Sequence, residues 1–165
     1  MTCTLFLTRH AKSAWNTDAP SDHARPLNKR GRRSAGALGN WLRQQSAQPQ
    51  QVLSSSAQRT RETYELMELP APATFTERLY HASAQIIFDV LREASKPNVL
   101  LLGHNPGLMQ FAHDIVKHPP AHSRFEDYPT GATLMVQFEI ASWDQLQTAS
   151  GRVLDFVVPR ELLGE

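Results

Sequence analysis

The chain has 165 residues, of which 41% are hydrophobic, and these values fit one folded domain over residues 1–165 rather than a disordered chain. The formal net charge of only +1 argues against a dedicated nucleic-acid-binding protein, since such proteins are usually far more basic. The single cysteine, Cys3, excludes an intrachain disulfide. No apolar run approaches the roughly 20 residues of a membrane span, and no signal-peptide pattern opens the chain. We therefore expect a cytoplasmic monomer that contacts neither membrane nor nucleic acid.

The first half of the chain alternates short apolar runs with helical patterns. Residues 4–8 are apolar and β-branched, which predicts a buried strand. Asn28 is a favourable N-cap for a helix whose apolar residues recur at helical spacing until a polar loop begins at Gln44. Residues 51–54 predict a second strand, and Ser56 is placed to cap a helix that continues to about residue 69.

The middle of the chain contains the clearest strand. A third helical pattern ends near Ser95. The run Val99–Leu102 is uniformly apolar, as central parallel strands are. Pro106 then fits the first turn of a helix whose apolar face extends to Val116.

The last third of the chain predicts two more strands, over residues 133–140 and 152–158, joined as a hairpin by the polar loop 142–151. Across the whole chain, strands alternate with helices. This order predicts an α/β fold, a three-layer α/β/α sandwich with a mainly parallel central sheet and helices on both faces.

Polar segments follow three of the predicted strands directly. Arg9 and His10 follow the first strand, the segment 54–59 follows the second, and Gly103-His104-Asn105-Pro106 follows the strand Val99–Leu102. Ligands of open α/β sheets bind outside the carboxyl ends of the strands. The topology therefore predicts that two histidines and two arginines, Arg9 and Arg59, gather at one edge of the sheet.

This combination of side chains suits a phosphoryl group. Arginine presents a planar fork of donors to phosphate oxygens, helix N-termini add oriented N–H groups, and histidine offers a nucleophilic nitrogen. Taken singly, His10 and His104 are more simply interpreted as hydrogen-bonded loop residues, and Arg59 as a surface residue. Their joint position after three strands favours phosphate chemistry.

The same residues resemble a known family. Leu7–Ser13 is similar to the Arg-His-Gly signature of the histidine phosphatase superfamily, and residues 54–63 resemble its second motif, with the arginine at Arg59. His104 falls on the second histidine of that family. Within the superfamily, residues 25–31 and Leu79-Tyr80 are most similar to the small SixA-type phosphohistidine phosphatases. The resemblance extends from about residue 5 to residue 134 and implies a histidine phosphatase-like fold.

The resemblance also implies roles for individual residues. His10 would be the nucleophile that accepts the phosphoryl group and becomes a covalent phosphohistidine. Arg9, Arg59 and His104 would share the catalytic work by stabilising the charge in transfer. The residues implied to bind the phosphoryl oxygens are Arg9, Asn16, Arg25, Arg59 and His104.

Two departures from the family pattern bear on mechanism. Ala11 stands where the signature has glycine, and a left-handed backbone there would cost energy. The long acidic motif that precedes the proton donor of the mutases is absent. Asp22 and Glu77 are the two candidates for the donor, with Asp22 favoured. A phosphoramidate substrate, whose nitrogen leaves readily, would need neither.

The remaining features give little support for other chemistry. His113, His118 and His122 lack acidic or cysteine partners at ligand spacing, so we expect no metal site. The run from Lys29 to Arg33 is interpreted as a solvated helix face, with attraction of anionic substrates as the alternative. No P-loop is present, and we expect no cofactor.

Together these features predict an enzyme: a metal-independent phosphatase that acts through a phosphohistidine on His10. Its substrate would be phosphohistidine in a protein or a small phosphorylated molecule. The chain is too short for a large lid domain, and the open site this implies suits a protein substrate. The alternatives are a general phosphatase of small phosphoesters and a non-catalytic phosphate-binding module. A mutase is disfavoured because the acidic motif is missing.

Overall fold

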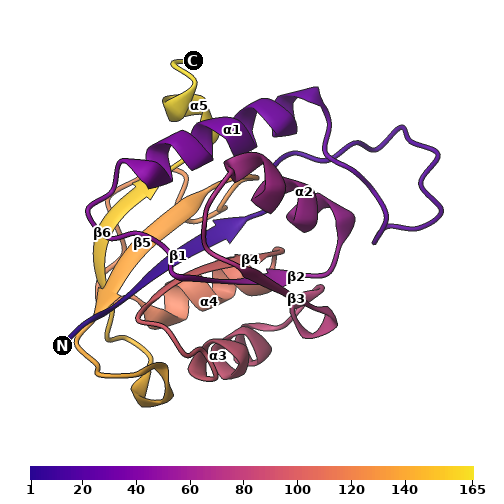
Figure 1. Cartoon of the computed structure of the whole chain (residues 1–165). Helices are drawn as coiled ribbons and strands as arrows, with labels where there is room; N and C mark the ends of the chain where they lie inside the picture. The colour runs from indigo at the N-terminus through magenta and orange to yellow at the C-terminus, as the bar shows by residue number, and fades with distance from the viewer.

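Six strands form one sheet in the order β3-β2-β4-β1-β5-β6, and the computed structural model describes all of residues 1–165 (Figure 1). The strands are β1 (Cys3–Arg9), β2 (Gln51–Ser55), β3 (Ala73–Thr76), β4 (Asn98–Gly103), β5 (Thr133–Phe138) and β6 (Arg152–Val157). The strands β1 to β4 are mutually parallel, whereas β5 runs antiparallel to both β1 and β6. The prediction of a mainly parallel sheet with a C-terminal hairpin is confirmed.

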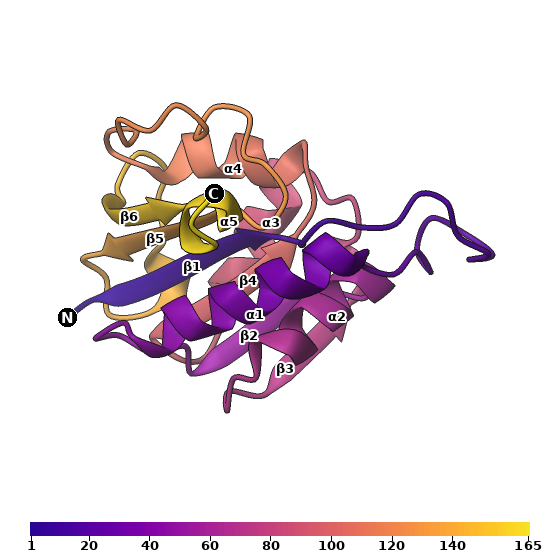
Figure 2. The same cartoon turned by 90° about the horizontal axis from the view of Figure 1, so that it is seen from above.

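Helices cover both faces of this sheet. The helices α1 (Lys29–Arg43), α2 (Gln58–Met67) and the short α5 (Pro159–Leu162) lie on one face, and α3 (Ala84–Arg92) and α4 (Gly107–Ile115) lie on the other (Figures 1 and 2). Two 3-10 turns, η1 (Glu77–Leu79) and η2 (Trp143–Gln145), complete the elements. The three-layer α/β/α sandwich is therefore confirmed.

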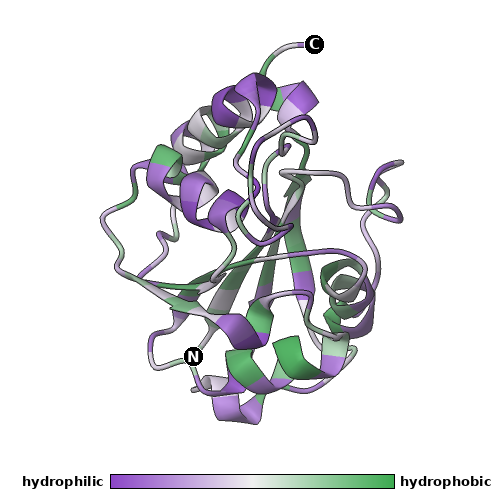
Figure 3. Cartoon of the chain, turned by 90° about the vertical axis from the view of Figure 1, so that its right-hand side faces the viewer, coloured by the Kyte–Doolittle hydropathy of each residue, from purple (hydrophilic) through white to green (hydrophobic).

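Each face of the sheet carries its own hydrophobic core. The larger cluster packs α3 and α4 against the sheet and includes the fully buried Phe111 and Leu101. The smaller cluster packs α1 and α2 against the opposite face and includes Phe6 and Leu38. Figure 3 shows hydrophobic residues along the strands of the sheet and also on the helices in the lower half of the view. Because successive residues of β1 and β4 point to opposite faces, both faces of these strands are buried, which explains their continuous apolar runs.

One of the two predicted helix N-caps differs from the structure. Asn28 is confirmed as an N-cap, since its Oδ1 accepts from the backbone N–H of Gly31 at 2.8 Å. Ser56 was wrongly predicted to cap α2; Ala57 occupies the N-cap position without a side-chain bond, and the Ser56 hydroxyl instead bonds His23 Nε2 at 2.9 Å. No helix is long and apolar enough to cross a membrane.

The strand β3 is absent from the elements that the sequence predicts. This strand has only four residues, lies at the edge of the sheet, pairs with β2 alone and is half-exposed. It follows the Pro70-Ala71-Pro72 segment, where the sequence predicts only the end of a helix, at about residue 69. Its presence matters for function, because the segment after it reaches the site described next.

Candidate active site

The loops after β1, β2 and β4 begin side by side at one edge of the sheet. Arg9 pairs with Gly103 in the register of β1 and β4, and the backbone N–H of His10 donates to Gly103 O at 3.1 Å. These loops, together with the segments that carry His81 and Thr130, line a cavity of about 320 Å³. Its lining residues are Arg9, His10, Lys12, Ser13, Trp15, Asp22, Arg25, Arg59, His81, His104, Asn105 and Thr130. The structure thus brings together the two histidines and two arginines of the sequence motifs, in a lining with four cationic side chains and one carboxylate.

The first loop is fixed by unusually close packing against α1. A Cβ atom on Gly31 would lie 2.0 Å from the carbonyl oxygen of Lys12, so only glycine permits this approach. Ala11 is fully buried and its backbone N–H donates to Thr63 Oγ1 at 3.1 Å. The φ of Ala11 is not positive, so alanine in place of the signature glycine carries no left-handed strain.

His10 is held as a neutral imidazole with a defined tautomer. Its Nδ1 lies 2.7 Å from Ala11 O, and because a carbonyl only accepts, Nδ1 carries the proton. The lone pair is therefore on Nε2. Burial, reinforced by three nearby arginines, lowers the pKa of His10 to about 3. At neutral pH this nitrogen is free to act as a nucleophile.

Nuclear magnetic resonance can test this protonation state directly. We expect the ring nitrogens of His10 in the ligand-free protein to report a neutral, Nδ1–H tautomer from pH 8 down to about pH 4, because its lowered pKa delays protonation. Protonation of His10 with a midpoint near 6.5 would contradict the burial argument.

Three buried nitrogens in the cavity lining have no hydrogen-bond partner: Arg9 Nε, Arg59 Nε and His104 Nδ1. Buried polar groups in folded proteins are nearly always paired, so an unpaired cluster calls for an explanation. All three can donate a hydrogen bond. An oxyanion in the cavity would give them a common acceptor.

His104 is oriented by Ser55 at the end of β2. Its Nε2 lies 2.8 Å from Ser55 Oγ, which itself accepts from the backbone N–H of Ala57 at 3.2 Å. The hydroxyl proton of Ser55 is thus available to Nε2, which leaves Nδ1 as the protonated nitrogen. Burial, followed by the charges of His10 and Arg59, lowers the pKa of His104 well below its usual value. A neutral His104 can donate to an oxyanion through Nδ1 and can gain a full charge once the anion is present.

Asp22 lies at the centre of a polar network across the cavity. Its Oδ2 accepts from Arg59 at 3.1 Å, from His81 Nε2 at 3.0 Å and from the Tyr80 hydroxyl. Its Oδ1 accepts from Arg25 Nε at 3.0 Å. These bonds, of which the one from Tyr80 has the largest effect, hold the pKa of Asp22 far below its usual value. The carboxylate is therefore ionised and already occupied as an acceptor.

Arg25 ties together the long loop that rims the cavity. Its NH1 donates to Ser13 Oγ at 2.8 Å and to Ala14 O at 2.9 Å. Its guanidinium stacks 3.7 Å from the centroid of the Trp15 ring, which is 77% exposed. The loop containing Trp15 projects from the body of the protein, at the right of Figure 2. Arg25 thus shapes the rim of the cavity in addition to lining it.

Two predicted site residues lie outside the cavity lining. Asn16 and Glu77 are both exposed, and neither has a side-chain hydrogen bond to a lining residue. In contrast, His81 and Lys12 line the cavity although neither is among the predicted site residues. Lys12 belongs to the first motif and could have been chosen there. His81 follows β3, which the sequence does not predict. Had β3 been predicted, the position of His81 shortly after the end of a strand would have marked it as a candidate site residue.

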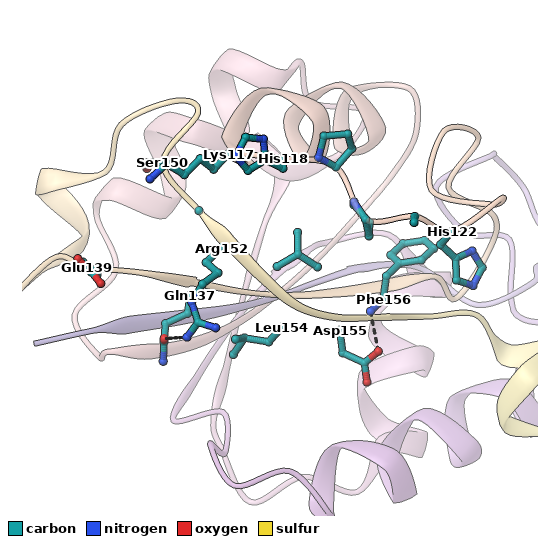
Figure 4. A pocket seen from close by; sticks show the side chains of 15 residues that line it. Lys117, His118, His122, Gln137, Glu139, Ser150, Arg152, Leu154, Asp155 and Phe156 are labelled. Atoms are coloured by element: carbon teal, nitrogen blue, oxygen red, sulfur yellow. Dashed lines mark hydrogen bonds between the residues drawn. The ribbon is translucent and has the colours of Figure 1, made fainter.

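A larger cavity, of about 800 Å³, lies elsewhere, between β6 and the segment 117–122 (Figure 4). His118 and His122 line it, but Figure 4 shows the two rings well separated, and His122 bonds Glu161 at 2.9 Å. No group of three or more potential ligands is placed to hold a metal ion anywhere in the structure. This cavity lacks the paired histidines and buried arginines of the smaller one, so we place the chemistry in the smaller cavity.

Known proteins resemble this chain in sequence and in fold. The profile of the histidine phosphatase superfamily (branch 1) matches residues 5–84. An uncharacterized protein of Mycobacterium tuberculosis is 31% identical over 159 residues, which cover 92% of this chain and 99% of the relative. A structure assigned as phosphohistidine phosphatase SixA of Nakamurella multipartitia has a TM-score of 0.86 and 25% identity, over 96% of this chain and 97% of that one. The protein histidine phosphatase SixA in complex with tungstate has a TM-score of 0.70 and 23% identity, over 96% and 99%.

The fold and the two-histidine, two-arginine site therefore define a phosphatase, and the chain belongs to the histidine phosphatase superfamily. Within that superfamily it is of the SixA type.

Proposed function

We propose that this phosphatase acts through a covalent phosphohistidine on His10, with phosphohistidine in a protein as its first candidate substrate. The observation that carries the proposal is the pairing of a neutral, tautomer-fixed His10 with unpaired buried donors on Arg9, Arg59 and His104. The nucleophile and the groups that would hold the phosphoryl oxygens are thus both prepared before substrate binds. The likeness to SixA proteins, one of which is complexed with the oxyanion tungstate, supports the same reading.

The proposed reaction has two steps. In the first, His10 Nε2 attacks phosphorus and the bond to the leaving group breaks. Arg9 and Arg59 bind the equatorial oxygens, where charge is spread during transfer, and His104 donates to a third. In the second step, water attacks the phosphohistidine, phosphate leaves, and His10 returns to its neutral state. Arg25 and Asn16 remain predicted as further phosphate ligands.

The size and polarity of the cavity favour binding of the phosphoryl group itself over binding of the rest of the substrate. The cavity of about 320 Å³ is lined almost wholly by polar side chains, and the exposed Trp15 stands at its rim. A small polar site of this kind suits a phosphorylated side chain on a protein surface. It also admits small phosphoesters, which makes a general phosphatase the second candidate.

A substrate panel separates these candidates. We expect kcat/KM for a phosphohistidine peptide to exceed that for a phosphoserine peptide of the same sequence and for sugar phosphates. Equal or higher values for sugar phosphates would favour the general phosphatase. Binding of all phosphorylated ligands without turnover of any would favour a phosphate-binding module.

The predicted cytoplasmic location and monomeric state are separate proposals, to be checked by fractionation and by light scattering.

Chelation tests the proposed independence from metal. We expect activity to be unchanged in excess EDTA, because the cationic side chains that line the cavity supply the positive charge that a metal would bring. The measurement is kcat/KM before and after exhaustive dialysis against chelator. Loss of activity that one divalent ion restores would contradict the proposal.

A further inference from the structure

The segment after β3 brings a histidine into the cavity that none of the family motifs includes. His81 lies between η1 and α3, lines the cavity, and its ring centroid is 5.0 Å from that of His104. Its Nε2 donates to Asp22 Oδ2 at 3.0 Å. Its other nitrogen, Nδ1, has no partner in the protein, and half of its side chain is exposed. His81 thus presents one ring nitrogen to a carboxylate and leaves the other available.

The backbone is held in a costly conformation to achieve this placement. The φ of His81 is +49°, in the left-handed region that residues with a Cβ rarely adopt. The next residue, Ala82, is buried against the start of α4, where a Cβ on Gly107 would lie 1.8 Å from the Ala82 carbonyl oxygen. Strained residues persist where surrounding packing holds them, and they gather at functional sites. The packing around Gly107 therefore fixes the position of His81.

We propose that His81, positioned by Asp22, is the proton donor to the leaving group. This inference rests on the proposed function, since it concerns the same reaction. The contact between His81 and Asp22 is that of a catalytic histidine–aspartate pair, in which the carboxylate fixes the tautomer of the imidazole and stabilises the imidazolium. Asp22 then acts as a positioning residue; its four bound donors leave it unsuited to carry the proton itself. Glu77 is exposed and lies outside the cavity lining.

The proton balances over the two steps. In the proposed step His81 begins as the imidazolium that Asp22 stabilises, with a proton on each ring nitrogen. As the bond from His10 Nε2 to phosphorus forms, the bond to the leaving group breaks, and its electron pair takes the proton from His81 Nδ1. Neutral His81 then accepts a proton through Nδ1 from the water that attacks the phosphohistidine. The electron pair of the broken nitrogen–phosphorus bond returns to His10, phosphate departs, and both histidines are restored.

The dependence of rate on the leaving group tests this role. A general acid contributes about 10²–10⁴-fold, and its contribution grows with the basicity of the leaving group. We expect His81→Gln, whose amide can still bond Asp22, to lower kcat/KM at least about 100-fold for an alkyl phosphate. For 4-nitrophenyl phosphate and phosphoramidate the loss should be much smaller. His23→Gln is the matched control, because His23 packs against Tyr80 but does not line the cavity; its effect should be equal on all substrates.

A second variant tests the coupling to Asp22. We expect Asp22→Asn alone to lower activity on every substrate, since it also releases Arg59. Adding His81→Gln to it should then cost little more on the alkyl phosphate, because paired groups are not additive. Equal losses on all leaving groups for His81→Gln would overturn the proposal. Such a result is distinct from failure of the proposed function, which would appear as wild-type protein that never becomes phosphorylated on His10.

Discussion

His10→Ala should lower kcat by at least about 10⁴-fold, since removal of an enzymatic nucleophile has effects of this order or larger. The imidazole of His10 lines a cavity and its only side-chain hydrogen bond is to the carbonyl of the adjacent Ala11. Its loss therefore removes the reacting nitrogen and little of the packing. Turnover of 4-nitrophenyl phosphate by purified variant and wild type, with matched thermal melts, gives the measurement.

The control for this variant is His118→Ala. His118 is exposed and lines the other cavity, so we expect wild-type turnover from it. The contradicting outcome is a His10→Ala protein that retains its melting temperature and keeps a kcat within about tenfold of wild type. Loss of a nucleophile leaves a far lower rate, so this result would show that His10 is not the nucleophile.

Arg59→Gln should cause the second-largest loss, about 10³-fold in kcat/KM, comparable to removing an arginine that stabilises charge in phosphoryl transfer. Arg59 is 2% exposed, and its NH1 and NH2 are fixed by the backbone oxygen and carboxylate of Asp22. Its Nε remains unpaired beside the cavity. The side chain is thus oriented before substrate arrives, so that little reorganisation is needed in the transition state.

Two further variants make this prediction specific. Arg59→Lys keeps the charge but loses the planar fork, and we expect it to recover only a small part of the activity. Arg61→Gln removes an arginine from the same helix whose Nε bonds Ser56 O and which does not line the cavity. Its effect should be less than about tenfold, in line with a change outside the site. Comparable losses of kcat/KM in Arg59→Gln and Arg61→Gln would contradict the prediction. They would show that both substitutions act by destabilising the helix and not by removing charge stabilisation from the transition state.

The sequence predicted those parts of the fold and site that depend on local pattern. The strand of residues 99–102 and the N-cap at Asn28 are signalled by apolar runs and by capping chemistry within a few residues. Arg9, His10 and His104 follow strands directly, so the topology alone brought them to one edge. These residues do line one cavity.

The features that the sequence did not predict depend on tertiary packing. The strand β3 is a four-residue edge strand without a strong apolar alternation. Because it was missed, the segment that carries His81 was not seen to follow a strand end. The tolerance for Ala11 depends on a backbone φ that the sequence does not reveal. The close approach of Gly31 to Lys12 depends on the packing of α1 against the loop after β1. Asn16 and Glu77 were chosen by position in a family pattern, and the structure leaves both outside the cavity lining.

Trapping of the reaction intermediate tests the central claim most directly. Wild-type protein mixed with substrate and quenched within milliseconds should carry one added phosphoryl group, stable in alkali and lost in acid, on the peptide that contains His10. The same peptide from His10→Ala should carry none. A phosphoryl group found on His104 or on another residue, or turnover by the wild type with no phosphorylated peptide at any quench time, would contradict the account.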